Sequence, residues 1–131
     1  MLIFMPSTKI VVHVEDNEDV AEMLAIVFDE FPVNWITAPT GADGLRLARE
    51  LHPDLVVLDL MLPDMPGRDV FMQMRDDPQL KRIPVWVLSV IWWNANLFPW
   101  HESSIVSYTF KPFDIYQFRD RVLDLLGIER Q

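Results

Sequence analysis

Short, uninterrupted apolar runs recur along this chain and predict β-strands that are buried on both faces. The clearest runs cover residues 10–14, 55–58 and 85–88, and two weaker runs cover residues 34–37 and 105–109. Continuous runs of this kind are typical of a parallel sheet that helices cover on both sides. The chain is therefore expected to form five such strands.

Between the apolar runs, hydrophobic residues return at the spacing of an amphipathic helix. The clearest pattern begins after Asn17, which is the expected N-cap. Its apolar face consists of Val20, Met23, Leu24, Val27, Phe28 and Phe31. Two more helices are predicted over residues 42–51, behind Thr40, and over residues 67–76, before Pro78.

A last helix follows the fifth strand, with Asp114 as its expected cap and Gly127 as its expected end. Its apolar face consists of Ile115, Phe118, Val122, Leu125 and Leu126. Strands that alternate with helices in this way predict an α/β fold with a doubly wound, five-stranded parallel sheet flanked by helices. One domain is expected over residues 9–127, with an N-terminal extension at 1–8 and a C-terminal tail at 128–131.

Composition limits the expected partners. The 131 residues include 11 Lys+Arg against 20 Asp+Glu, which gives a formal net charge of −9. A field of that sign repels nucleic acid and anionic lipid, so neither DNA nor a membrane is an expected partner. Cysteine is absent, which excludes disulfides and thiolate metal sites and makes the cytoplasm the expected compartment.

The residues that end the predicted strands form a candidate site, because ligands of open α/β sheets bind beyond the carboxyl ends of the strands. Glu15 and Asp16 follow the first strand, Asp59 the third, Ser89 the fourth and Lys111 the fifth. Three carboxylates repel one another, and one lysine offsets only one of their charges. Such hard oxygen ligands favour Mg²⁺ shared with a phosphoryl group, and one of the carboxylates can act as a nucleophile on phosphorus.

With these residues in this order, the sequence resembles the response regulator receiver domain family of two-component signalling over nearly the whole chain. The similar motifs are the Glu15-Asp16 pair, the sequence LDLMLPDMPG at residues 58–67, Ser89, and the sequence YTFKPF at residues 108–113. The resemblance implies a flavodoxin-like fold with the strand order 2-1-3-4-5. It also implies a function, a phosphorelay switch that signals by protein contact and is not an enzyme.

The resemblance further implies the chemistry of the acidic site. Asp59 would be the phospho-acceptor and would take a phosphoryl group from a histidine kinase or a phosphotransfer protein. Asp16, Asp59 and the Met61 carbonyl would bind Mg²⁺, and Glu15 would bind it directly or through water. The downstream target protein is not identified by the sequence.

The remaining motif residues are expected to hold the phosphoryl group and to transmit its presence. By the resemblance, Lys111 and Ser89 would contact the phosphoryl oxygens, and Tyr108 would change rotamer together with Ser89 as the switch. The peptide bond before Pro112 would be cis. These roles follow from the family and not from spacing.

Residues 91–104 depart from the family, in which a fourth helix occupies this place. Pro99 is poorly tolerated inside a helix, so the fourth helix is expected to be short or irregular. The Trp-rich segment at residues 92–100 either folds back over the sheet or forms an exposed apolar patch, and both arrangements stay open. An exposed patch would suit the alternative function, a phosphorylation-independent scaffold or a module that forms a homodimer.

Two positions that border the expected crevice carry apolar side chains, Met61 after Asp59 and Ile91 after Ser89. Neither can orient a water molecule, so a long-lived aspartyl phosphate is expected. A metal-dependent phosphatase on the same fold fits less well, because the stretch after Asp59 lacks a second acid that could protonate a leaving group.

The three histidines have no expected role in the chemistry. His13 lies within the first strand and His52 precedes a proline, so both are expected to be structural, and His101 is expected to be exposed. Since no second domain follows Gln131 in this sequence, the signal is expected to leave through protein contact, unless the chain is a piece of a larger regulator.

Overall fold

The computed structural model describes residues 8–90 and 104–130. The expected short or irregular fourth helix, the Trp-rich segment, Ile91 and His101 lie outside these residues. Within them, the five predicted strands and the four helices that the sequence delimits are present, with bounds that differ by a few residues at most.

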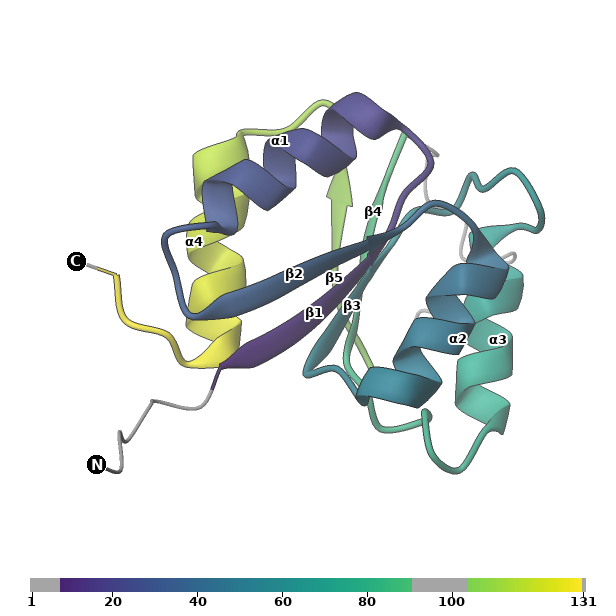
Figure 1. Ribbon diagram of the computed structural model, residues 1–131. Helices are drawn as coiled ribbons and strands as arrows, with labels where there is room; N and C mark the ends of the chain where they lie inside the picture. The colour runs from purple at the N-terminus through teal and green to yellow at the C-terminus, as the bar shows by residue number, and fades with distance from the viewer. Residues whose placement is uncertain (1–7, 91–103, 131) are drawn as a thin grey trace.

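The strands form one parallel sheet in the order β2-β1-β3-β4-β5, which confirms the predicted fold class and strand order (Figure 1). Their bounds are β1 Lys9–Val14, β2 Val33–Ala38, β3 Leu55–Leu58, β4 Val85–Ser89 and β5 Ile105–Phe110. β1 and β3 pair with a neighbour on each edge, and helices cover both of their faces. This burial explains why their sequences are uninterrupted apolar runs.

Helices cover the sheet in two layers. α1 (Glu18–Phe28) and α4 (Ile115–Leu126) lie on one face, and α2 (Gly41–Leu51) and α3 (Gly67–Asp76) lie on the other (Figure 1). Alternate residues of β1 enter the two cores, so that Val12 packs under α2 and α3. Among the described residues, no helix is both long and apolar enough to cross a bilayer.

Polar side chains close the helix starts as the sequence predicts. The side chains of Asn17 and Asp114 each accept two backbone N–H groups at the starts of α1 and α4, and Thr40 accepts the N–H of Asp43 in α2. Gly127 ends α4 with a φ of 72°, a left-handed conformation that glycine adopts without steric cost. Three of the four described helices thus begin at a side-chain cap, whereas α3, whose N-cap is Pro66, has none.

Some predicted positions on the apolar helix faces differ from the structure. α1 ends at Phe28, so Phe31 lies beyond the helix, and Met23 is 40% exposed. In α4, Leu125 is 44% exposed, whereas Leu123, which was not predicted to face the core, is fully buried. Periodicity locates an apolar stripe but does not fix how the helix is rotated on the sheet, and residues at the edge of the stripe depend on that rotation.

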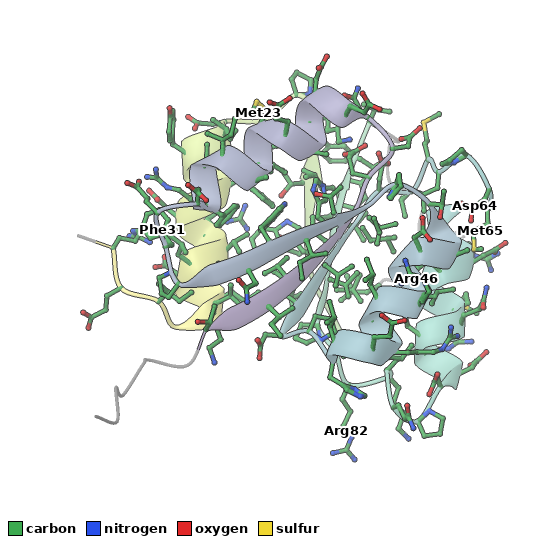
Figure 2. The ribbon with its side chains drawn as sticks, in the orientation of Figure 1. Met23, Phe31, Arg46, Asp64, Met65 and Arg82 are labelled. Atoms are coloured by element: carbon green, nitrogen blue, oxygen red, sulfur yellow. The ribbon has the colours of Figure 1, made fainter. Side chains whose placement is uncertain are left out.

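The loop between β3 and α3 is bound to the start of α2. Asp64 in this loop accepts the N–H groups of Gly41 at 2.8 Å and of Ala42 at 2.9 Å, and these bonds lower the pKa of its carboxyl group. Figure 2 shows Asp64 and Met65 beside the first turn of α2. The loop thus supplies a cap for a helix that precedes it in the sequence.

Candidate functional site

Four polar side chains meet at the carboxyl edge of the sheet, where the sequence predicts a site. Glu15, Asp59 and Ser89 are buried there, with exposed fractions of 2%, 6% and 0%. Lys111 reaches them from the end of β5, although it is 96 positions from Glu15 in the sequence. The parallel sheet brings these residues together because all its strands end at one edge.

From residues that the structure describes, the Asp59 carboxylate accepts three hydrogen bonds. Its Oδ1 accepts the Ser89 hydroxyl at 2.8 Å and the Met61 N–H at 2.9 Å, and its Oδ2 accepts the Lys111 ammonium at 3.0 Å. Burial alone would raise the pKa of Asp59, but the Met61 N–H and the positive charge of Lys111 outweigh burial and lower it. Asp59 is therefore an anion at neutral pH, with its oxygens held in place.

Glu15 lies in the same crevice, but its pKa is shifted in the opposite direction from that of Asp59. Burial raises the pKa of Glu15 to about 7, although the Lys111 ammonium donates a hydrogen bond to its Oε1. Burial would lower the pKa of Lys111, but its bonds to Glu15 and Asp59 raise it, so the lysine stays charged. One cation thus faces two buried carboxyl groups, and the crevice is short of positive charge.

A third carboxylate adds to this excess. Glu15, Asp16 and Asp59 each offer an oxygen, and these oxygens lie within 4.8 Å of one another. Asp16 is exposed, so the cluster opens to solvent on that side. Clustered carboxylate oxygens with an unbalanced negative charge are a donor set that fits a hard divalent cation such as Mg²⁺.

The other predicted site residues surround this cluster. The Met61 side chain is 55% exposed, beside the N–H that its backbone gives to Asp59. Tyr108 packs on Phe110 with ring centroids 4.5 Å apart, and burial together with the negative charge of Asp59 raises its pKa. The Lys111–Pro112 peptide bond is cis.

His13 lies beside the site, which sequence reasoning did not foresee. Its side chain is fully buried, its Nδ1 accepts the Trp35 indole N–H at 3.3 Å, and its Nε2 lies 3.7 Å from Oε1 of Glu15. Burial and then the charge of Lys111 lower the pKa of His13 to about 3, so the imidazole is neutral. The available signal was a polar residue inside a buried run, two positions before Glu15 and hence on the same side of the strand.

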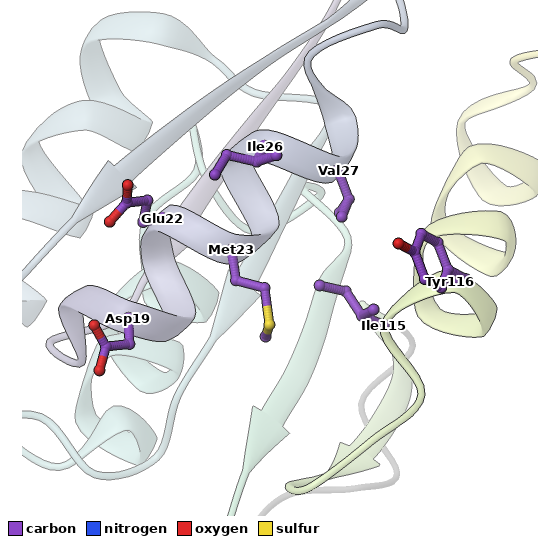
Figure 3. Close-up of a pocket in the computed structure, with 7 residues that line it drawn as sticks. All are labelled: Asp19, Glu22, Met23, Ile26, Val27, Ile115 and Tyr116. Carbon is purple, nitrogen blue, oxygen red and sulfur yellow. The ribbon is translucent and has the colours of Figure 1, made fainter.

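A separate groove lies between α1 and the start of α4, and Figure 3 shows its mainly apolar lining. The residues that line it are Asp19, Glu22, Met23, Ile26, Val27, Ile115 and Tyr116. None of them belongs to the acidic crevice. The groove and the crevice are therefore distinct features of the molecule.

The chain is similar to known proteins over nearly its whole length. The family described as "Response regulator receiver domain" matches residues 11–123. Among relatives, the polar-differentiation response regulator DivK of Brucella ovis is 30% identical over 120 residues, which cover 92% of this chain and 98% of that protein. The relative and this chain thus correspond over almost their full lengths.

Solved structures give the same result for the fold. The receiver domain of Francisella response regulator 1452 has a TM-score of 0.79 at 26% identity, covering 92% of this chain and 98% of that one. The phosphorylated cyanobacterial phytochrome response regulator RcpA has a TM-score of 0.74 at 30% identity, covering 90% and 91%. The chain therefore belongs to the response regulator receiver domain family of two-component signalling.

Proposed function

We propose that this receiver domain, spanning residues 9–127, is a cytoplasmic switch in which Asp59 accepts a phosphoryl group from a histidine kinase or a phosphotransfer protein. The observation that supports this most directly is the state of Asp59, a buried carboxylate that is kept anionic and bound through both oxygens. The related RcpA, at 30% identity, is described as phosphorylated.

The transfer would be a displacement at phosphorus. A carboxylate oxygen of Asp59 attacks the phosphoryl group of a phosphohistidine, and the P–O bond forms while the P–N bond breaks. The donor nitrogen keeps the electron pair of the broken bond and takes up a proton. Lys111 and Ser89 already contact Asp59, so they are placed to stabilise the charge on the phosphoryl oxygens. Tyr108, on the adjoining strand, would follow the movement of Ser89.

Magnesium would complete this site. Asp16, Asp59 and the Met61 carbonyl would hold the ion, with Glu15 bound to it directly or through water. When bound, Mg²⁺ offsets the negative charge of the carboxylates and of the phosphoryl oxygens. The excess of carboxylates over the single lysine supports this assignment.

The decisive experiment is the intact mass of the folded protein after incubation with Mg²⁺ and a small-molecule phosphoryl donor. We expect one phosphoryl adduct on the wild type and none on Asp59→Asn. Asp64→Asn is the matched control, because it removes an exposed carboxylate from the same loop and should still form the adduct. Folded wild-type protein that forms no adduct in Mg²⁺ would contradict the proposed function.

The phosphoryl group is expected to leave slowly. The Met61 side chain stands two positions after Asp59 and cannot position a water molecule for attack on the acyl phosphate. We expect Met61→Gln to shorten the lifetime of the adduct, while Met61→Leu, the apolar control, should keep it. Rapid loss from the wild type, unchanged by either substitution, would refute this part of the proposal.

The signal is proposed to leave by contact with another protein, since receiver domains act as signalling modules. A phosphorylation-independent scaffold built on the Trp-rich segment is not proposed, because that segment lies outside the described residues. The mass experiment also separates the two functions, since a scaffold would not need the adduct.

A further inference from the structure

His13 has a buried ring nitrogen, Nε2, without a hydrogen-bond partner among the described residues. The Trp35 indole can only donate, so Nδ1 of His13 must carry a lone pair, and the ring hydrogen must sit on Nε2. A protonated imidazole would have hydrogens on both nitrogens and could not accept this bond.

The direction of this N–H is set by neighbouring rings. Trp35 stacks on Phe28 of α1 with ring centroids 4.2 Å apart and an interplanar angle of 7°. His13 meets the edge of the same indole, with centroids 5.3 Å apart. Both contacts to His13 thus come from the Trp35 indole, which Phe28 in turn holds by stacking, and this indole fixes the orientation of His13.

The fixed N–H faces the acidic crevice. Nε2 of His13 is 3.7 Å from Oε1 of Glu15, which is longer than a hydrogen bond. The same oxygen accepts the Lys111 ammonium, which also binds Asp59. A shift of about 0.8 Å in the Glu15 carboxylate would bring Oε1 within ordinary hydrogen-bond distance of Nε2.

Phosphorylation would change the partners of Glu15. A phosphoryl group on Asp59 adds oxygens that compete for Lys111, the one cation in this cluster as the described residues form it. Glu15 is only 2% exposed, so water cannot replace the lysine readily. Oε2 of Glu15 keeps the Asn17 N–H at 3.2 Å, but Oε1 would lose its lysine. A buried carboxylate oxygen that loses its donor is unfavourable unless another donor takes its place.

We propose that His13 is a positioning residue whose Nε2–H takes over Oε1 of Glu15 when Lys111 turns to the phosphoryl group. This inference rests on the phospho-acceptor function proposed above. The indole of Trp35 serves as the anchor, because its N–H keeps the donor hydrogen of His13 on Nε2. His13 touches neither the phosphoryl group nor the metal in this scheme; it acts through Glu15.

One test does not depend on phosphorylation. Long-range ¹H–¹⁵N NMR of the imidazole rings would be recorded for the wild type and for Lys111→Met, which removes the competing cation. The pH would lie well above 7, because the Glu15 pKa is about 7 with Lys111 present and rises when the lysine is removed. We expect the Nε2–H tautomer of His13 in both proteins and a downfield shift of that proton in Lys111→Met. A hydrogen on Nδ1, or a His13 proton with the same shift in both proteins, would overturn the inference whether or not Asp59 is phosphorylated.

A second test uses the rate at which the phosphoryl adduct forms. His13→Leu, which removes the N–H, should slow adduct formation about tenfold, the typical worth of a hydrogen bond to a charged group. His13→Gln should recover most of the rate, because its side-chain amide can present an N–H at a similar reach. Equal rates for wild type and His13→Leu would reject the positioning role and leave the acceptor role of Asp59 intact. Failure of His13→Gln to recover the rate would reject it as well, and would assign His13 to packing.

Discussion

The two cores on either side of the sheet are built from different side chains. Beneath α2 and α3, the buried residues are aliphatic or methionine, apart from Phe71. Beneath α1 and α4, the rings of Phe28, Trp86 and Phe118 are buried, and Trp35 packs against them. Both cores exclude water, so both should contribute strongly to stability.

The core beneath α1 and α4, called the ring side below, also brings hydrogen-bond donors into the interior, whereas the core beneath α2 and α3 is called the aliphatic side. The Trp86 indole donates to the Thr109 hydroxyl at 2.9 Å, and the Trp35 indole donates to His13, next to the acidic crevice. The aliphatic side stabilises the fold through the packing of apolar side chains, whereas the ring side also orients polar groups. Equal losses of stability on the two sides should therefore have unequal effects on the site.

The largest expected effect comes from removing one buried ring on each side. Phe71→Ala and Phe28→Ala should each cost about 3–5 kcal/mol of unfolding free energy, measured by urea denaturation. Phe28→Ala should also shift the Trp35 indole N–H resonance in NMR, because Trp35 loses the ring on which it stacks, while Phe71→Ala should not. If the alanine variants do not fold, Phe71→Leu and Phe28→Leu are compared instead. Equal shifts of the Trp35 indole resonance in both variants would contradict the proposed difference between the two cores.

A close backbone contact on the aliphatic side gives the next effect. A Cβ on Gly67 would lie 2.2 Å from the Asp59 carbonyl oxygen and 2.6 Å from the Leu60 Cα, and neither backbone atom can yield easily. Gly67→Ala should lower the unfolding free energy by about 1–3 kcal/mol or more. Gly44→Ala is the comparison, because its Cβ would meet the side chain of Val14 and no backbone atom. A larger loss in Gly44→Ala, by the same urea measurement, would contradict this account.

The ring side should show a dependence on pH that the aliphatic side lacks. The pKa of His13 is lowered from 6.5 to about 3 in the folded protein, so the unfolded chain takes up a proton first as the pH falls. The stability due to neutral His13 is present above pH 6.5 and is lost as the pH falls from there towards 3. The carboxyl of Glu15, with its pKa raised to about 7, acts in the opposite sense, with a contribution that is lost as the pH rises through that value.

His13→Leu isolates this dependence. In magnesium-free buffer, the wild type should lose stability relative to His13→Leu as the pH is lowered from 6.5 towards 3. Val12→Ala, on the aliphatic side, is the control and should follow the wild-type pH profile with a constant offset. Parallel profiles for wild type and His13→Leu would mean that His13 titrates as it does in the unfolded chain.

The smallest effect is expected from charges that lie outside both cores. Arg46 on α2, labelled in Figure 2, pairs with Asp43 at 3.4 Å and with Glu50 at 3.5 Å, and all three side chains are exposed. Arg46→Ala should change the unfolding free energy by less than about 0.5 kcal/mol, and added salt should reduce that change further. A loss comparable with that of Gly67→Ala would show that these surface ion pairs contribute as much as the close backbone contact, and would contradict this ranking.

Much of the fold could be predicted because its signals are local. The uninterrupted run at residues 55–58 and the caps Asn17 and Asp114 depend only on nearby sequence, and the structure has them as expected. Parallel strands end at one edge, so the meeting of Asp59 with Lys111 followed from strand order. These features need no knowledge of how side chains of different strands interlock.

What could not be predicted depends on the register between elements. β1 and β2 pair so that Val11 lies opposite Trp35, and this register brings the indole within reach of His13. The hydrophobic pattern of the sequence does not determine that register, so the sequence indicated only that His13 is a strand residue. The exposure of Leu125 and the burial of Leu123 depend in the same way on how α4 is rotated against the sheet.

The carboxylate of Asp64 has a mechanical consequence for the loop behind the site. One end of this loop donates the Met61 N–H to Asp59, and farther along, both oxygens of Asp64 are fastened to the first turn of α2. A change in the hydrogen bond between the Met61 N–H and Asp59 therefore acts on a loop that is already bonded to α2. A displacement at Asp59 would therefore reach the surface helix α2 along this loop, whose Leu62 and Met65 also pack against the core beneath α2 and α3.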